Sequence, residues 1–224
     1  MRTQSFNAAI VIALLVSANS LLAADQMTRF DARSGSKVRI EGTSSVHDWQ
    51  VEGKLIGGHV EVGPNFPTEP GQTVQPGKVD AKVEAFIPVR SLMSIEKDGK
   101  PYKATMDDTM YGKLKADSSP KIFYYLNELV LKEMPKSKEA PYVFDSKGEL
   151  AISGKTNMIS MVVNVLPLTD KTGEKRVKIS GKTALKMTSF GIEPTSIVIS
   201  KTGDDVTIKF DWIVGKKTAA AAAK

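Results

Sequence analysis

Residues 79–89 read VDAKVEAFIPV, and apolar and polar side chains alternate along most of this stretch. Its odd-numbered positions are apolar, while Asp80, Lys82 and Glu84 occupy even-numbered positions. A period of two is typical of a β-strand with one buried and one wet face. The same alternation returns at residues 177–187 and 206–214. The pattern therefore predicts an all-β fold.

Six further segments have strand-like composition, namely 29–33, 37–41, 46–62, 121–131, 142–153 and 158–168. Dipeptides that end in glycine and favour tight turns occur between or beside these segments, at Ser34-Gly35, Lys147-Gly148, Thr172-Gly173 and Thr202-Gly203. Gly57-Gly58 lies inside the long 46–62 segment and predicts a bulge or a sharp bend. Residues 63–77 carry four prolines and predict an open loop, and 132–141 predict a second polar loop. About nine strands at regular spacing favour a barrel or a sandwich.

One segment predicts a helix. Pro101 suits the first helical position. Tyr102, Met106, Met110 and Leu114 then recur every four residues and form one apolar stripe. We expect this stripe to pack across the mouth of a barrel or onto its side.

The first 24 residues have the features of a secretory signal peptide. Arg2 supplies the positive charge, residues 8–16 form a short apolar run, and small residues follow. The run is shorter than the roughly 20 apolar residues that a membrane-spanning helix needs. We therefore expect export to the periplasm, one domain over residues 25–216, and a disordered alanine-rich tail at 217–224.

The composition limits the classes of function. The formal net charge is +6 and is spread along the chain, and aromatic residues make up 7%. A nucleic-acid binder needs a basic stripe with stacking aromatics, so we expect no nucleic-acid partner. A modest positive charge is compatible with transient attraction to an anionic membrane surface. The chain has no cysteine, so its stability must come from its core rather than from disulfides.

The chain has few side chains suited to catalysis. Its two histidines, His47 and His59, fall on the same predicted strand segment, and carboxylates near them are scattered. No HExxH, CxxC or GxSxG motif occurs, so we predict no catalytic residue and no metal site. His47 lies in the segment 43–49 (TSSVHDW), where it could bond a ligand head group. Alternatively it bonds nearby backbone while Trp49 packs.

The methionines allow two interpretations. Several of them cluster in the middle and late chain, at Met93, Met106, Met110, Met158, Met161 and Met187. Flexible, polarizable methionine lines cavities for apolar ligands of variable shape, and it also fills irregular cores. The pattern alone does not choose between a cavity and a filled core.

These motifs, in this order, resemble the YceI-like family of exported, lipocalin-like barrel proteins. The segments that carry the resemblance are 42–49 (GTSSVHDW), 87–94 (IPVRSLMS), the helix with Met106 and Met110 followed by 114–116, then 120–123 (PKIF), 148–156 (GELAISGKT) and 188–192 (TSFGI). Together they cover about residues 27–215. The sequence departs from the family at 186–189 (KMTS), where an arginine and an acidic residue often stand, so the head-group contact is not carried over. The histidine-aspartate-tryptophan form at 47–49 is common only in part of the family, so the ligand's identity is not carried over either.

The resemblance implies an antiparallel lipocalin-like barrel of about eight or more strands, with the helix near its opening. It implies no cofactor but a bound amphiphile such as an isoprenoid quinone or a fatty-acid-like lipid. By this analogy the candidate ligand-binding residues are His47, Trp49, Met106, Met110, Phe123, Tyr125, Met161, Val163, Met187 and Phe190.

Three functions compete at this point. The first is a periplasmic carrier that holds an isoprenoid or fatty-acyl lipid and catalyses nothing. The second is an enzyme acting on such a lipid with His47 as acid or base, which an exposed His47 would weaken. The third is an interaction or stress protein with a solid core. An edge strand in an incompletely closed barrel could also pair two subunits into a homodimer.

Overall fold

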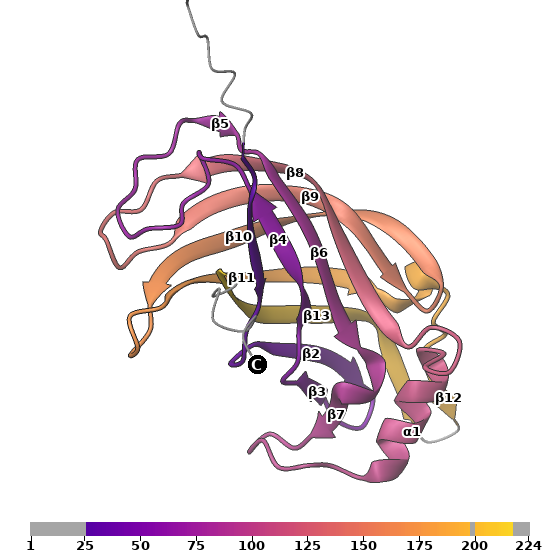
Figure 1. The fold of residues 1–224 in the computed structure, drawn as a ribbon. Helices are drawn as coiled ribbons and strands as arrows, with labels where there is room; N and C mark the ends of the chain where they lie inside the picture. Colours follow the sequence, from indigo (N-terminus) through magenta and orange to yellow (C-terminus); the bar gives the residue numbers. More distant parts are fainter. Residues whose placement is uncertain (1–25, 198–199, 217–224) are drawn as a thin grey trace, which may run out of the picture.

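The computed structural model describes residues 26–197 and 200–216. The predicted signal peptide, residues 1–24, and the predicted tail, residues 217–224, lie outside the described residues. The predicted domain is one β-barrel with an added sheet and a helix (Figure 1).

Eight antiparallel strands close the barrel in the part of the chain that is described. In order around the barrel they are β1 (Thr28–Ala32), β4 (Gly57–Val62), β6 (Ala81–Pro88), β8 (Lys121–Glu133), β9 (Tyr142–Ile152), β10 (Lys155–Thr169), β11 (Lys175–Lys186) and β13 (Ser200–Lys216). The barrel closes where Phe30 and Ala32 of β1 lie opposite Lys216 and Val214 of β13. The prediction of an all-β, antiparallel barrel is confirmed.

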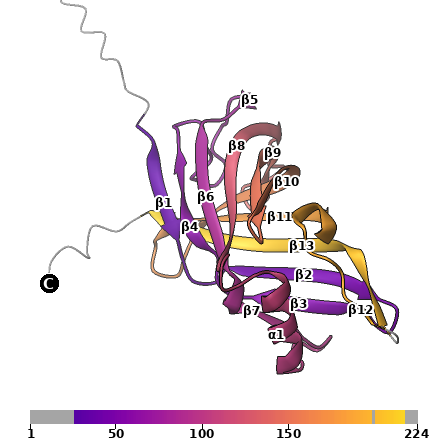
Figure 2. The same ribbon diagram turned by 90° about the vertical axis from the view of Figure 1, so that its right-hand side faces the viewer.

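The barrel wall divides at one end, because β13 has a different partner along most of its length. Residues 202–211 of β13 pair with β2 (Lys37–Ser44), which continues the sheet through β3 (Trp49–Gly53) to β7 (Leu92–Ile95). Figure 2 shows this second wall, with α1 (Ala104–Lys113) beside β7. The short strands β5 (Gly77–Lys78) and β12 (Ser196–Ile197) pair with β8 and β13. The short 3-10 helices are η1 (Val89–Ser91) and η2 (Met187–Phe190).

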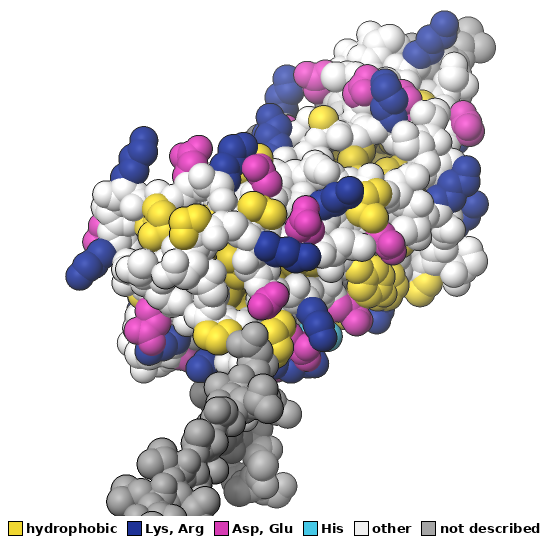
Figure 3. Space-filling view, turned by 90° about the horizontal axis from the view of Figure 1, so that it is seen from above, with side chains coloured by type: hydrophobic (Ala, Val, Ile, Leu, Met, Phe, Trp, Pro, Cys, Tyr) yellow, Lys and Arg dark blue, Asp and Glu magenta, His cyan; other side chains and the backbone are white. Residues whose placement is uncertain are grey.

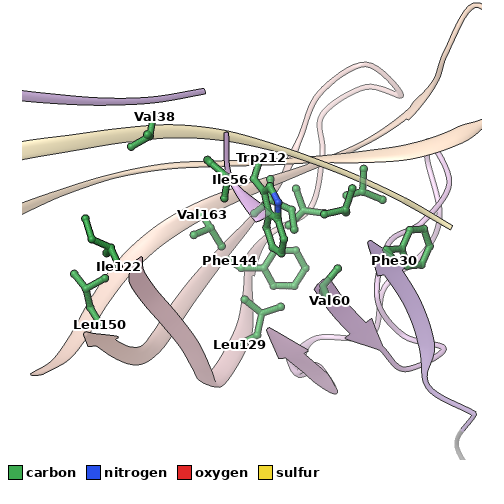
Figure 4. Packing of buried hydrophobic residues seen from close by; sticks show 14 of the residues in the cluster. Phe30, Val38, Ile56, Val60, Ile122, Leu129, Phe144, Leu150, Val163 and Trp212 are labelled. Carbon is green, nitrogen blue, oxygen red and sulfur yellow. The ribbon is translucent and has the colours of Figure 1, made fainter. Parts of the chain in front are cut away.

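The core fills the end of the barrel that β1 and β13 close. Phe30, Val60, Phe144 and Trp212 are all at most 3% exposed there. Figure 4 shows the Trp212 ring reaching from its strand toward Phe144 and Leu129. These inward residues alternate with outward polar ones, as the period of two predicts.

The long strand predicted over 46–62 is wrong. It consists of β3 and β4, which pair with different neighbours, β2 and β1. Residues 54–56 separate the two strands. Gly58 lies inside β4 with φ +108°, where a side chain would meet the carbonyl oxygen of Glu84. His47 and His59 therefore lie on different elements.

Two of the predicted turns lie inside strands. Lys147-Gly148 belongs to β9, where Gly148 lets the backbone of Tyr125 approach beside a register shift. Thr202-Gly203 belongs to β13, where Gly203 faces Thr43, again beside a register shift. Both glycines serve close packing and bulges rather than reversals. The turns at Ser34-Gly35 and Thr172-Gly173 are confirmed.

The proline-rich segment 63–77 is not an open loop. Phe66 and Val74 are buried, and Phe66 stacks on Phe144 at 6.3 Å between ring centroids. The Gln72 side chain accepts hydrogen bonds from the backbone of Thr68 and Glu69 and donates one to the carbonyl of Phe66. Because Phe66 and Val74 are packed into the core, this segment closes one end of the barrel.

The helix begins at Ala104, three residues later than the sequence predicts. Pro101 forms an isolated bridge with Ile95, and the backbone N–H of Tyr102 donates to the carbonyl of Ser94. This short pairing with β7 keeps the chain extended until Lys103. It also covers the outer edge of β7, which would otherwise be free to pair with another strand.

Candidate functional site

A cavity of about 690 Å³ opens between the two walls at the divided end of the barrel. Its interior surface is apolar, with Ile40, Val51, Leu185, Ile192 and Ile208 among its lining residues. This volume falls within the roughly 300–1,000 Å³ of small-molecule sites. We call it the outer cavity.

A smaller chamber of about 130 Å³ lies deeper in the barrel. Ile40, Ile122 and Ile208 line both spaces, so the chamber and the outer cavity are neighbouring parts of one apolar interior. We call the smaller space the inner chamber. Its far side contains Phe66 and Trp212, at the plugged end of the barrel.

The helix α1 forms one side of the outer cavity. Tyr102, Met106, Met110 and Leu114 all line it. The predicted helical stripe is confirmed for Met106, Met110 and Leu114, whereas Tyr102 lies on the extended segment before the helix. Met110 and Leu114 also pack against the core, whereas Met106 is 40% exposed.

Three polar contacts fix the helix in this position. The Asp107 carboxylate accepts a hydrogen bond of 2.6 Å from the backbone N–H of Ser94, and the Tyr111 hydroxyl donates one of 2.7 Å to the carbonyl of Leu92. On the opposite side of the mouth, the Lys113 ammonium donates to the carbonyl of Glu193 at 2.9 Å. Burial, followed by the negative charge of Asp107, raises the pKa of Tyr111, so this hydroxyl stays a donor at neutral pH.

The short helix η2 places Met187 and Phe190 against the cavity. Asp204 accepts hydrogen bonds from both the backbone N–H and the hydroxyl of Thr188, at 2.8 and 2.7 Å. These hydrogen bonds from Thr188 lower the pKa of Asp204, so the carboxylate is ionised at neutral pH. Gly191 ends the turn with φ +67°, which favours glycine.

Polar groups gather at the rim of the outer cavity. Asp48, Glu96, Lys97, Asp98 and Lys186 line it together with Gln50. The Gln50 Oε1 atom is buried and has no hydrogen-bond partner among the described residues. Both charge signs are present, so the rim does not select strongly for one sign of charge.

His47 is exposed on the loop 45–48 at this rim. Its Nδ1 atom lies 3.0 Å from the carbonyl oxygen of Asp48, and its ring contacts Tyr102 edge-on at 6.2 Å between centroids. The hydrogen bond to nearby backbone matches one of the two interpretations of this histidine. The exposure weakens a role in acid–base catalysis.

Trp49 packs across Gly42 and lines the outer cavity. Its indole N–H donates a hydrogen bond of 3.1 Å to the carbonyl of Thr43, and this bond holds the ring against the cavity wall. Position 42 accommodates no residue larger than glycine, because a side chain there would overlap the indole ring.

Nine of the ten candidate residues from the sequence line one of the two spaces. The outer cavity contains His47, Trp49, Met106, Met110, Met187 and Phe190, and the inner chamber contains Phe123, Met161 and Val163. Tyr125 lines neither space and is 40% exposed. The binding roles of these residues stay predictions.

The position of Tyr125 follows from the register of β8. Ile122 and Leu129 of this strand are buried, whereas Tyr125 stacks on Phe123 at 5.8 Å between centroids, on the outer side. Phe123 also contacts Phe86, whose ring covers Gly57. Phe123 is two residues from Tyr125 and shares its face of β8, although it also borders the inner chamber, whereas Tyr124 lies on the opposite, interior face.

Sequence reasoning missed several lining residues. Ile40, Ile122, Tyr124 and Ile208 face the cavity system, and Trp212 lines the inner chamber. The alternation in 206–214 places Ile208 and Trp212 on one face, and this signal could have identified both.

No group of three or more His, Asp or Glu side chains suited to a metal ion occurs within residues 26–197 and 200–216. Over the same residues, no helix combines the length and apolar character needed to cross a membrane. Figure 3 shows basic and acidic side chains interspersed over the face seen from above.

The sequence profile of the YceI-like domain matches residues 29–213. The chain belongs to the YceI-like family. This match spans both walls of the cavity, the helix α1 and η2. A comparison with curated proteins finds no match.

Solved structures show the same fold at low sequence identity. BcnA of Burkholderia cenocepacia is 17% identical, with a TM-score of 0.54, over 80% of this chain and 95% of that one. A polyisoprenoid-binding domain from Saccharophagus degradans, implicated in plant cell wall breakdown, is 9% identical, with a TM-score of 0.59, over 85% and 99%. A YceI protein of Campylobacter jejuni is 14% identical, with a TM-score of 0.51, over 75% and 85%.

Proposed function

We propose that this YceI-like protein binds an amphiphilic lipid, with an isoprenoid or fatty-acyl chain, in the joined outer cavity and inner chamber. The observation that carries the proposal is an apolar cavity of about 690 Å³ that its own side chains leave open, with a polar rim. A solid-core protein would have filled this space. The polyisoprenoid-binding domain of similar fold supports the same class of ligand.

Burial of an apolar chain supplies the binding energy without any catalytic group. Each methylene removed from water contributes about 0.8 kcal/mol. A chain that buries ten such groups therefore gains about 8 kcal/mol, before the cost of association. Met106, Met110 and Met187 line the cavity and can adapt to chains of different shape. We propose a carrier rather than an enzyme.

A pair of methionine variants tests lipid binding directly. Met110→Arg places a charge in the outer cavity wall, whereas Met158→Arg places the same side chain on the exposed outer face of β10. The measurement is displacement of a fluorescent fatty acid by a menaquinone with a short isoprenoid chain and by oleic acid. We expect Met110→Arg to weaken binding at least tenfold and Met158→Arg to leave it unchanged. Equal binding by both variants would place the ligand elsewhere and contradict the proposal.

We also propose that the carrier works in the periplasm, on the basis of the signal-peptide features of residues 1–24. N-terminal sequencing of the protein from a periplasmic fraction tests this. A mature chain that begins after residue 20, 23 or 24 supports export, and an intact Met1 in the cytoplasm contradicts it.

Two further partners belong to this proposal. Met106 on α1 and Val46 beside the rim are 40% and 63% exposed, and they lie where a lipid would pass between a membrane surface and the cavity. Transient contact with anionic vesicles, measured by co-sedimentation at low salt, is the expected behaviour. The homodimer stays a prediction, and a measurement of the protein's molecular mass in solution tests it. The edge of β7 is covered, which argues against pairing of two subunits through that strand.

A further inference from the structure

The inner chamber is apolar except for a few polar atoms, and two of these are unpaired. The Trp212 indole N–H belongs to a side chain that is 3% exposed, and it has no hydrogen-bond partner among the described residues. The buried hydroxyl of Tyr124 likewise lacks a partner in hydrogen-bond geometry within that part of the chain. Both residues line the chamber.

Such groups are costly when they are left unpaired. A buried donor without an acceptor loses its hydrogen bonds to water and destabilises the fold by about 1–3 kcal/mol. An indole offers a donor only, and a phenol offers a donor and an acceptor. Burial raises the pKa of Tyr124 although the nearby Ser146 hydroxyl lowers it in part, so the phenol is protonated at neutral pH.

The chain itself offers little to satisfy these donors. Ser146 lies near Tyr124, but its hydroxyl donates to the carbonyl of Met161 at 3.1 Å, and the two hydroxyls do not meet the geometry of a hydrogen bond with each other. In Figure 4, Phe144 and Leu129 lie close to the Trp212 ring, and the indole N–H has no hydrogen-bond partner among the described residues. The charged groups of the rim differ from Trp212 and Tyr124, because they are exposed and water at the mouth can satisfy them.

We propose that the inner chamber is a subsite for an oxygen acceptor at the leading end of the bound lipid, with Trp212 and Tyr124 as its hydrogen-bond donors. The ligand class is a long apolar chain that ends in a carbonyl or hydroxyl oxygen. The oxygen end lies deep in the barrel, and the apolar chain fills the outer cavity toward the mouth. This inference rests on the proposed lipid-binding function and adds an orientation and a chemical requirement to it.

A pair of matched probes tests the requirement for oxygen. 2-Heptadecanone and 2-methylheptadecane have main chains of equal length, and a methyl group in the alkane takes the place of the carbonyl oxygen in the ketone. Their affinities are measured by displacement of a fluorescent fatty acid from the full mature protein, its Trp212→Phe and Tyr124→Phe variants, and the control Tyr125→Phe, which removes a hydroxyl from a residue that lines neither space. We expect each chamber variant to lower the affinity for the ketone roughly 2- to 12-fold, the range of one hydrogen bond. The alkane affinity and the control should not change.

The two tryptophans of the chain also report the orientation. Trp49 lines the outer cavity and Trp212 the inner chamber, so each single-tryptophan variant senses one compartment. 5-Bromo-2-heptadecanone should quench Trp212 in Trp49→Phe, and 17-bromo-2-heptadecanone should quench Trp49 in Trp212→Phe.

The outcomes separate this inference from the proposed function. A ketone affinity that falls in Tyr124→Phe, with Trp212 quenched by the 5-bromo probe, supports the subsite even if Trp212→Phe fails to fold. Unchanged ketone affinity in the chamber variants that fold, with Trp49 quenched by the 5-bromo probe, overturns the subsite but leaves lipid binding intact. Failure of the fluorescent fatty acid itself to bind the wild-type protein, with no mass gained on adding ketone or alkane, overturns lipid binding itself.

Discussion

The carboxylate of Asp107 on α1 accepts a hydrogen bond of 2.6 Å from the backbone N–H of Ser94 on β7. This bond fixes the helix beside the cavity, because Ser94 itself is buried in the cavity wall. A hydrogen bond to a charged group is worth about 1.5–3 kcal/mol, and partial exposure of Asp107 reduces it toward the lower end. We predict that Asp107→Ala loosens α1 and raises the rate of lipid release about fivefold.

The matched control is Asp108→Ala, which removes the next carboxylate. Asp108 is exposed and makes no hydrogen bond among the residues that the structure describes. Release rates follow from stopped-flow transfer of a fluorescent fatty acid to vesicles. Equal rates for the two variants would show that the position of α1 does not limit release.

Replacement of Gly42 should disturb the cavity wall through Trp49. A Cβ atom at residue 42 would overlap the indole ring of Trp49, so the ring must move. Overpacking of this kind costs about 1–3 kcal/mol. We predict that Gly42→Ala lowers the free energy of unfolding in urea by that amount and weakens lipid binding.

Gly112→Ala provides the contrast, because a Cβ atom at that helical position has no neighbour within 4 Å. There the change should stabilise α1 by about 0.5–1 kcal/mol. If Gly42→Ala proves as harmless as Gly112→Ala, Trp49 does not occupy the position described.

The segment 63–77 should stabilise the barrel by closing its end. Phe66 is 2% exposed and stacks on Phe144. Phe66→Ala should lower the free energy of unfolding by about 3–5 kcal/mol, whereas Phe66→Leu, which keeps most of the volume, should lower it by less than about 1.5 kcal/mol. Urea titrations of both variants test this, and a small effect of the alanine variant would mean that the segment is not part of the core.

The free energy of unfolding should fall at acid pH, and protonation of Glu52 should account for part of the loss. Burial alone would raise the pKa of this carboxyl, but hydrogen bonds and positive charge from Lys37 and Arg39 outweigh it and lower the pKa. A group with a lowered folded pKa stabilises the fold above the unfolded value, about 4.3 for glutamate, and loses that contribution as the pH falls through the folded value.

Glu52→Gln should therefore cost about 1 kcal/mol at pH 7, because partly exposed ion pairs are weak, and the difference from wild type should shrink below about pH 4. The control is Glu84→Gln, since Glu84 is exposed and forms no ion pair within the described residues. Urea unfolding from pH 3 to 7 measures both, and a pH-independent difference for Glu52→Gln would contradict the ion-pair account.

The barrel and the part of the helical stripe from Met106 onward could be predicted because each has a clear period, whereas Tyr102 precedes the helix. Tyr102, Met106, Met110 and Leu114 all reach the outer cavity at the predicted spacing. The faces of β8 could not be assigned, because residues 122–126 are all apolar and no alternation distinguishes Tyr124 from Tyr125. The division of the wall was also hidden, since β13 changes partner from β2 to β1 through long-range pairing that no local pattern records.

The central claim is that the open interior holds a lipid. Native mass spectrometry of the protein purified from periplasm without detergent tests it most directly, with solvent extraction to identify what is released. The account predicts one lipid of a few hundred daltons per chain, with an oxygen at one end. A protein that carries no lipid and gains no mass with added isoprenoid quinones or fatty acids would contradict it.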